Sequence, residues 1–235
     1  NLAFGYVNAD GSLNVQDIKN MYSTIKLAQQ KKVSVLMSIG GGGSQNFSSA
    51  ILDEKNRARL VSNLVQVHSS LGLDGIDVDY EEWDGGPGGA SAMDIQRRTA
   101  LEALYKELRE ALPEKALITA AVNGSYDHGG WGFYNCFNNT MHEYLDYITI
   151  MIYDETGPWP SSAVGPHSSW NFFEKSISHW LNNRKLPKEK LIPGVPFYGY
   201  LFQSPTSAEN AQSVAYSDIL LRFPDQEAHL LNEIG

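Results

Sequence analysis

The chain has 235 residues, with 18 Lys and Arg against 27 Asp and Glu, which gives a formal net charge of −9. Hydrophobic residues make up 42% and charged residues 19%, which is typical of a folded chain and excludes a disordered one. No run approaches the roughly 18 apolar residues of a membrane-spanning helix. The acidic balance and the lack of basic clusters argue against a nucleic acid partner. Cys136 is the only cysteine, which excludes an internal disulfide and a cysteine metal cluster.

Short apolar runs alternate along the chain with longer segments whose apolar residues recur at helical spacing. The first run ends at Val7, and the segment after it carries Ile18, Met21 and Ile25 on one helical face. We therefore predict strands at residues 1–7, 33–41, 75–81, 117–123, 146–154 and 191–199. Helices are predicted at residues 15–32, 53–71, 94–112, 170–184 and 213–223.

Nearly continuous apolar strands separated by helices predict a parallel sheet that is covered by helices. A doubly wound open sheet and a (β/α)8 barrel both fit this pattern. No G-x-G-x-x-G follows the first strand, and residues 38–43 (SIGGGG) lack the lysine of a P-loop. The predicted strands end instead in polar and aromatic residues, as barrel enzymes do. We predict a (β/α)8 TIM barrel that forms a single domain over residues 1–235. The residues at the strand ends are Ser38, Asp79, Glu81, Asn123, Tyr153, Asp154 and Tyr198.

Residues 74–81 (DGIDVDYE) are the most informative segment. Alternate side chains of a strand share one face, so Asp77, Asp79 and Glu81 point the same way, each roughly 6.5–7 Å from the next. Crowded carboxylates retain protons and spread their pKa values, which suits a general acid. Glu81 lies nearest the strand end and is the predicted acid, Asp79 holds or relays the proton, and Asp77 supports Asp79. Asp74 has the opposite parity and is expected to serve the turn.

Two other interpretations of this acidic row remain open. The row could be a polar barrel interior that neighbouring donors satisfy. It could also be a divalent-cation site. A single strand spaces its ligands widely for a cation, however, and no histidine or further acidic pair is placed to complete a site. The six histidines show no H-x-x-x-H spacing, and we interpret them as surface or packing residues.

The chain resembles the family-18 glycoside hydrolases, the chitinases and their relatives. Residues 74–81 match the D-x-x-D-x-D-x-E signature of that family. Other segments resemble further family elements in the same order along the chain. They are Phe4 in an A-F pair, residues 38–41 (SIGG), residues 151–154 (MIYD), residues 157–159 (GPW) and residues 194–199 (GVPFYG).

This resemblance implies a retaining hydrolase that uses substrate-assisted catalysis, without a cofactor or a metal. Glu81 would protonate the glycosidic oxygen and later act as base for water. The substrate's own N-acetyl oxygen would attack the anomeric carbon, with the large effective molarity of an internal nucleophile. Asp79 would hydrogen-bond the acetamide N–H, and Tyr153 would donate its hydroxyl to the acetamide carbonyl. Asp77 and Ser38 would support Asp79.

The resemblance also implies substrate-binding residues, for each of which plain packing stays an alternative. Trp159 resembles a residue that stacks on the sugar beyond the cleaved bond. Phe4 and Met151 could line the pocket around the reacting sugar, and Tyr198 could line the site as well. Asp154 would hydrogen-bond the sugar or a catalytic group. Trp83, which follows the acidic motif, could contact substrate or lie at the surface.

The chain departs from the family pattern in several places. By motif order it runs from the second to the seventh barrel strand, so we expect an excerpt of a longer protein, incomplete at both ends. Tyr200 stands where many relatives have arginine, and Glu82 and Trp83 replace a common aromatic–proline pair. Few residues follow the seventh strand before the next helix, so no clear insertion domain is predicted.

The predicted function is hydrolysis of β-1,4-linked N-acetylglucosamine polymers, so the expected partner is chitin or an N-acetylglucosamine-containing oligosaccharide. One alternative is an endo-β-N-acetylglucosaminidase that acts on N-glycans. Another is a non-catalytic chitin-binding lectin of the same fold, although Glu81 and Asp79 are both present. We expect a monomer with no nucleic acid partner and no membrane span. The substrate class suggests that the protein is secreted, periplasmic or displayed at the cell surface.

Overall fold

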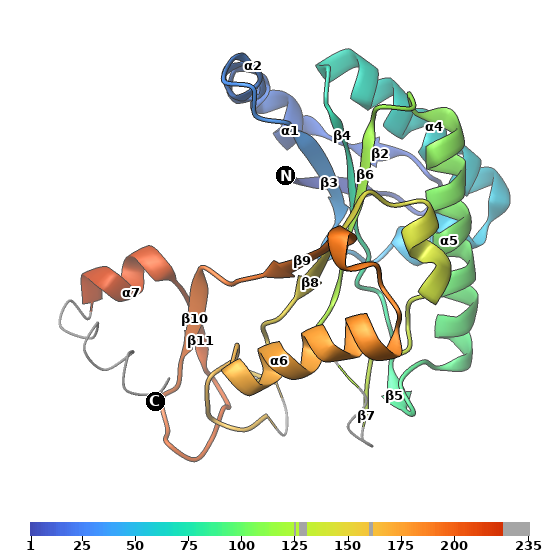
Figure 1. Ribbon diagram of the computed structural model, residues 1–235. Helices are drawn as coiled ribbons and strands as arrows, with labels where there is room; N and C mark the ends of the chain where they lie inside the picture. The colour runs from blue at the N-terminus through green and yellow to red at the C-terminus, as the bar shows by residue number, and fades with distance from the viewer. Residues whose placement is uncertain (125, 127–130, 160–161, 223–235) are drawn as a thin grey trace.

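A seven-stranded sheet in the order β2-β1-β3-β4-β6-β8-β9 forms the centre of the molecule (Figure 1). The computed structural model describes all residues except 125, 127–130, 160–161 and 223–235. Six strands of this sheet are parallel to their neighbours, and β2 (Leu13–Asn14) pairs antiparallel with β1 at one edge. The parallel strands are β1 (Leu2–Val7), β3 (Leu36–Gly40), β4 (Gly75–Asp79), β6 (Leu117–Asn123), β8 (Tyr147–Met151) and β9 (Leu191–Gly194).

The parallel strands follow one another across the sheet in chain order, without a reversal. A doubly wound sheet would reverse its order at a switch point, whereas a barrel winds in one direction. This confirms the (β/α)8 barrel class, to which the described residues contribute six parallel strands. That these are the second to seventh strands of a barrel stays a prediction from the order of the motifs.

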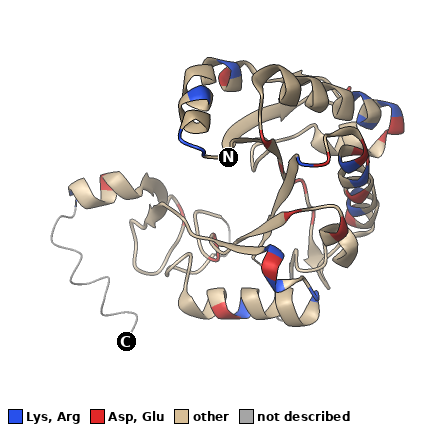
Figure 2. Ribbon diagram, turned by 45° about the horizontal axis from the view of Figure 1, so that its top comes forward, with Lys and Arg blue, Asp and Glu red and all other residues tan. Residues whose placement is uncertain are grey.

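Helices pack along the outer side of this sheet, and Figure 2 shows many of the charged residues on them. A hairpin of β10 (Tyr198–Leu201) and β11 (Gln212–Ala215) projects from the sheet with α7 (Tyr216–Arg222), as Figure 1 shows. A second small ribbon pairs β5 (Gly86–Pro87) with β7 (Trp131–Gly132). The remaining helices are α1 (Gln16–Asn20), α2 (Tyr22–Gln30), α3 (Phe47–Leu52), α4 (Glu54–Leu71), α5 (Ala92–Ala111), η1 (Asn139–Glu143), α6 (Trp170–Ser178), η2 (His179–Asn183) and η3 (Lys188–Lys190).

The core lies between the sheet and these helices. Ile76 and Val78 of β4 are fully buried in it, together with Leu64 of α4 and Leu104 of α5. Because side chains alternate along a strand, the other residues of β4 face the opposite side of the sheet. The packing of the helices therefore fixes which face of β4 carries the acidic residues.

Several predicted boundaries are wrong. The predicted strand 191–199 is interrupted after Gly194, because Pro196 has no N–H for the ladder, and the chain pairs again only at Tyr198 in the hairpin. The first residues of the predicted helix 213–223 belong to β11. The predicted helix 15–32 divides into α1 and α2 at Met21. The predicted strand 75–81 ends at Asp79, so Glu81 lies just beyond it.

The start of α5 is fixed by one buried carboxylate. Asp94 accepts backbone N–H bonds from Asp84, Gly85 and Ser91, each at 2.9 Å, and a bond from Arg97 at 3.1 Å. Ser91 in turn accepts the Asp94 N–H, which completes a capping box. The segment that follows the acidic motif is therefore tied to the outer helix. Within the described part of the chain, no helix has the length and apolar character needed to cross a bilayer.

We predict that Asp94→Ala lowers the free energy of unfolding by about 2–4 kcal/mol, because it leaves several buried donors without an acceptor. Asp53→Ala is the matched control, since Asp53 caps α4 through a single bond from the Asn56 N–H. That change should cost only about 1 kcal/mol. Urea unfolding of both variants measures the difference. Equal losses would contradict the anchoring role of Asp94.

Candidate active site

The acidic row of β4 lies in the middle of the sheet. Asp77 and Asp79 are 3% and 8% exposed, and they are paired in register with Ser38 and Gly40 of β3. On the other side Asp77 is paired with Thr119 of β6. The two aspartates share one face of β4, as their spacing predicts. Burial this deep requires donors for the carboxylate oxygens.

Hydroxyl groups on the two flanking strands supply those donors to Asp77. Ser38 Oγ donates to Asp77 Oδ2 at 2.5 Å, and Thr119 Oγ1 donates to Asp77 Oδ1 at 2.5 Å. The predicted support from Ser38 thus reaches Asp77 directly. Thr119 was not predicted from the sequence, although its position on a strand next to β4 and its short hydroxyl side chain were available signals.

Asp79 lies in a different environment. Its Oδ1 is buried and has no hydrogen-bond partner among the described residues. Burial, with the neighbouring charges of Glu81 and Asp77, raises the pKa of Asp79 to about 8. Asp79 therefore carries a proton at neutral pH and presents an acceptor that no described residue uses.

Glu81 follows the end of β4, beside a glycine loop formed by residues 40–43. Burial, with the charge of Asp154, raises the pKa of Glu81. A Cβ at Gly42 would lie 3.5 Å from Glu81 Oε1, so the loop passes close to the carboxylate. A Cβ at Gly40, where φ is +104°, would lie 2.0 Å from the Asp79 carbonyl oxygen. Glycine is therefore required where this loop crosses the end of β4.

Glu82 fixes the far end of the glycine loop. Its Oε1 accepts bonds from Ser44 Oγ and the Phe47 N–H, both at 2.8 Å, and its Oε2 accepts the Ser48 N–H at 2.7 Å. Burial raises the pKa of Glu82, but these bonds outweigh it and hold the pKa below its ordinary value. The pKa values of the two adjacent glutamates therefore shift in opposite directions, because protein donors hold the Glu82 carboxylate and lower its pKa, whereas the pKa of Glu81 is raised.

Tyr153 and Asp154 follow β8, whose last residue is Met151. Met151 is nearly buried and is paired in register with Asn123 and Gly194. Burial, with the charges of the nearby carboxylates, raises the pKa of Tyr153 to about 12. Asp79 and Glu81 are the first two of those carboxylates, so the Tyr153 hydroxyl is a neutral donor beside the acidic row.

Asp154 adopts a left-handed backbone conformation, with φ of 63°, and two tyrosine hydroxyl donors and a histidine ring nitrogen converge on its Oδ1. The hydroxyl of Tyr198 lies at 2.6 Å, the hydroxyl of Tyr200 at 2.9 Å and Nδ1 of His167 at 3.2 Å. Burial raises the pKa of Asp154, but these bonds outweigh it and hold the pKa below its ordinary value. His167 and Tyr200 were not predicted as site residues.

The aromatic candidates differ in burial: Phe4 and Trp159 are partly exposed, and Trp83 is buried. Phe4 is half-buried, and its ring packs on Gly41, where a Cβ would lie 2.8 Å from Phe4 Cζ. Trp159 is 38% exposed and packs edge-on against Tyr200, with ring centroids 6.0 Å apart. Trp83 is buried, so the expectation that it lies at the surface is wrong, while its contact with substrate stays a prediction. Its Nε1 donates to the carbonyl oxygen of Tyr80, and its ring packs against Tyr80 and Phe137.

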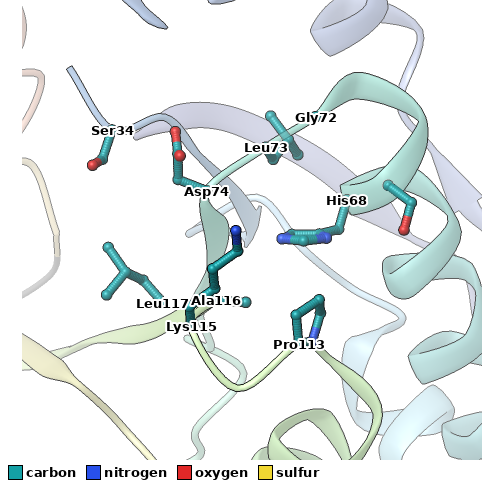
Figure 3. Close-up of a pocket in the computed structure, with 10 residues that line it drawn as sticks. Ser34, His68, Gly72, Leu73, Asp74, Pro113, Lys115, Ala116 and Leu117 are labelled. Carbon is teal, nitrogen blue, oxygen red and sulfur yellow. The ribbon is translucent and has the colours of Figure 1, made fainter. Parts of the chain in front are cut away.

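A separate hollow of about 520 Å³ lies at the opposite end of the strands (Figure 3). Its lining includes His68, Asp74 and Lys115. Asp74 accepts the Val35 N–H at 2.7 Å and so links the start of β4 to the residue before β3, while its predicted role in the turn stays a prediction. In barrels this end serves stability, and functional groups lie at the carboxyl ends of the strands. The acidic row is therefore the candidate active site. Among the described residues, no group of three or more His, Cys, Asp or Glu side chains is arranged to hold a metal ion.

Comparisons with known proteins find relatives for this arrangement. The sequence profile of glycosyl hydrolases family 18 matches residues 1–230. A probable endochitinase of Caenorhabditis elegans is 29% identical over 232 residues, which cover 84% of this chain and 35% of that protein. A chitinase structure from Bacteroides thetaiotaomicron is 28% identical with a TM-score of 0.78, over 96% of this chain and 68% of that one. A chitinase from the chitin utilization locus of Flavobacterium johnsoniae is also 28% identical, with a TM-score of 0.74, over 95% and 68%. The chain spans about half or less of the curated relatives it matches.

Asp79→Asn should stabilise the protein increasingly as the pH rises. The folded chain holds a proton on Asp79 up to a pH of about 8, whereas the unfolded chain releases it near 3.8. The stability of the wild type therefore falls as the pH rises through this window. Asparagine does not ionise, so the variant should gain at least about 2 kcal/mol over the wild type between pH 4 and pH 9.

Urea unfolding across that pH range measures the gain. Asp17→Asn, at an exposed position of α1, is the control and should keep a constant difference from the wild type. A constant difference for Asp79→Asn as well would show that Asp79 does not retain its proton.

Proposed function

Because the chain belongs to glycosyl hydrolase family 18, we propose that it hydrolyses β-1,4-linked N-acetylglucosamine polymers, chitin or chito-oligosaccharides, with retention and by substrate-assisted catalysis. One observation carries the proposal. The buried acceptor Asp79 Oδ1 has no partner among the described residues, and it belongs to a row with Glu81. Chitinases among the relatives, one of them from a chitin utilization locus, support the substrate class.

Glu81 is the general acid in this mechanism. A general acid must be protonated at working pH, and the raised pKa of Glu81 favours that state. Glu81 protonates the glycosidic oxygen while the bond from that oxygen to the anomeric carbon breaks. The resulting carboxylate then removes a proton from the water that completes hydrolysis. Proton retention by Asp79, next in the row, keeps a second proton beside Glu81.

The substrate supplies the nucleophile. The oxygen of its 2-acetamido group attacks the anomeric carbon and forms an oxazolinium ion, and water then opens this ion, so that two inversions give retention. Asp79 Oδ1 accepts the acetamide N–H, and the Tyr153 hydroxyl donates to the acetamide carbonyl oxygen. Holding the internal nucleophile in place supplies a large effective molarity. This chemistry requires N-acetylglucosamine at the cleaved position.

The neighbouring sugars have candidate contacts on the side of Trp159. A hollow of about 410 Å³ lies between Pro158, Trp159 and Ser162 on one side and residues 206–209 of the hairpin on the other. An exposed tryptophan beside a hollow offers a stacking surface for a sugar ring. Phe4 and Met151 flank the reacting sugar in this proposal, and action on chitin implies secretion or surface display.

Glu81→Gln tests the proposed function. The wild type should hydrolyse a chromogenic chitobioside and defined N-acetylglucosamine oligomers, with the β-anomer as the first product by NMR. The variant should lose about 10²–10⁴-fold in kcat, the contribution of a general acid. Glu82→Gln is the matched control, because its carboxylate is held by protein donors. It should lower thermal stability but keep the activity of the folded fraction.

Other outcomes distinguish the alternatives. Release of glycan from a high-mannose glycopeptide, with chitin oligomers left intact, would identify an endo-β-N-acetylglucosaminidase. Binding of chitin without hydrolysis would identify a lectin. Unchanged kcat in Glu81→Gln, or an α-anomer as the first product, would overturn the mechanism.

Tyr153→Phe removes the hydroxyl that is proposed to align the acetamide. We expect a loss of about 10²-fold in kcat, with a smaller change in KM, because one preorganised donor to the reacting oxygen is removed. Tyr147→Phe, at the exposed start of the same strand, is the control and should behave as the wild type. Steady-state kinetics on the chitobioside measure both. A hundredfold rise in KM at constant kcat would assign Tyr153 to binding alone.

A further inference from the structure

Asp154 receives all of its side-chain hydrogen bonds from the described residues on one oxygen. Tyr198, Tyr200 and His167 converge on Oδ1, and no described residue donates to Oδ2. The side chain is 41% exposed. Two hydroxyls donate to Oδ1, and the doubly protonated form of His167 adds a third donor, so the carboxylate cannot rotate without breaking these bonds. Its second oxygen therefore has a fixed orientation.

His167 connects the two segments that form this arrangement. Its side chain is 12% exposed, and Nε2 lies 3.1 Å from the Tyr198 carbonyl oxygen, which accepts from it. Nδ1 accepts the Asp154 N–H at 3.4 Å in the neutral ring and lies 3.2 Å from Asp154 Oδ1, to which it donates when the ring is doubly protonated. Its own carbonyl oxygen accepts the Glu155 N–H at 3.0 Å. Its ring lies against Tyr198 and Tyr200, with centroids 5.0 and 5.1 Å away. One histidine thus joins the chain after β8 to the hairpin strand β10.

We propose that His167, together with Tyr200, is a positioning residue that holds the Asp154 carboxylate in place against Glu81. This inference rests on the proposed function, in which Glu81 is the acid. It assigns a role to a histidine that touches neither the acidic row nor the reacting sugar in the mechanism above. Tyr200 contributes through its hydroxyl bond to the same oxygen.

The electrostatic consequence can be stated from the groups that surround Asp154. His167 faces it from the loop after β8, Tyr198 and Tyr200 face it from β10, and Glu81 and Tyr153 feel its charge. The hydrogen bonds favour the ionised form of Asp154, and that charge favours the protonated form of Glu81. We call the contacts of His167, Tyr198 and Tyr200 with Asp154 Oδ1 the clamp. Loss of the clamp should therefore raise the pKa of Asp154 and lower the pKa of Glu81. The pH range in which Asp154 is charged while Glu81 is protonated then becomes narrower.

The test uses His167→Phe and His167→Gln in the intact protein. Phenylalanine keeps the ring contacts but donates no hydrogen bond, whereas glutamine keeps one N–H donor. On the chromogenic chitobioside, His167→Phe should lower kcat about 10-fold with KM changed less than about 3-fold. The pH range over which kcat is high should become narrower at both its acidic and its basic limit. His167→Gln should restore kcat to within about 3-fold of the wild type.

Two further variants control the test. Tyr200→Phe should narrow the profile in the same direction by a smaller amount, and it carries the test if His167→Phe fails to fold. His142→Gln is the matched control, because His142 bonds a backbone carbonyl in η1, away from the site, and its profile should equal that of the wild type. Unchanged pH limbs in both His167→Phe and Tyr200→Phe would overturn the proposal and leave His167 a packing residue.

A measurement without substrate separates this inference from the proposed function. The carboxyl ¹³C signal of Asp154 should titrate at higher pH in His167→Phe than in the wild type. If the wild type hydrolyses no N-acetylglucosamine substrate, the proposed function fails, while this titration still tests the clamp. An identical titration in the two proteins would overturn the clamp even if the wild type is an active hydrolase.

Discussion

Three carboxylates at the end of one central strand repel one another and lose their hydration. The surrounding structure compensates this free-energy cost to a different extent for each of them. Asp77 is satisfied by hydroxyls of Ser38 and Thr119 from the two flanking strands. Asp79 receives no such bond on Oδ1 and keeps a proton instead, with its pKa raised to about 8. Glu81 lies beyond the strand, near the glycine loop. Three carboxyl groups thus have three different environments within five positions.

The glycine loop is a consequence of that crowding. The chain after β3 must pass over the end of β4, and the Gly41 N–H donates to the Asp79 carbonyl oxygen at 2.8 Å. At Gly40 a side chain would collide with that same carbonyl, and at Gly41 it would collide with the Phe4 ring. Glu82 then anchors the loop from the other side through three hydrogen bonds. The glycine run, which resembles a phosphate loop by composition, therefore serves close packing around carboxylates.

The alternation of apolar and amphipathic segments, together with the polar and aromatic residues at the strand ends, predicted the barrel class, and period-two spacing predicted the acidic face of β4. Both signals are local, so a single sequence contains them. Thr119 and Tyr200 were missed because their partners lie 42 and 46 residues away, and His167 was missed because a lone histidine has no spacing that marks it. Trp83 was misjudged because its position next to the acidic motif says nothing about the direction of its side chain. Pro196 marks this break in the sequence, but the apolar residues around it led to the prediction of one continuous strand.

Burial alone does not set the protonation of the acid, because Asp154 and Glu81 are both partly buried and their pKa values move in opposite directions. Hydrogen bonds on Oδ1 hold the pKa of Asp154 down, and the resulting charge adds to burial in raising the pKa of Glu81. When the pKa values of two carboxyl groups are separated in this way, one group is suited to acid chemistry and the other to carrying a fixed charge. The separation depends on His167 and on the two tyrosines of the hairpin strand, so the hairpin contributes to the electrostatics of a candidate site whose proposed acid lies just beyond the central strand. For this reason β10 is better regarded as part of the active site than as a connection that follows the last parallel strand.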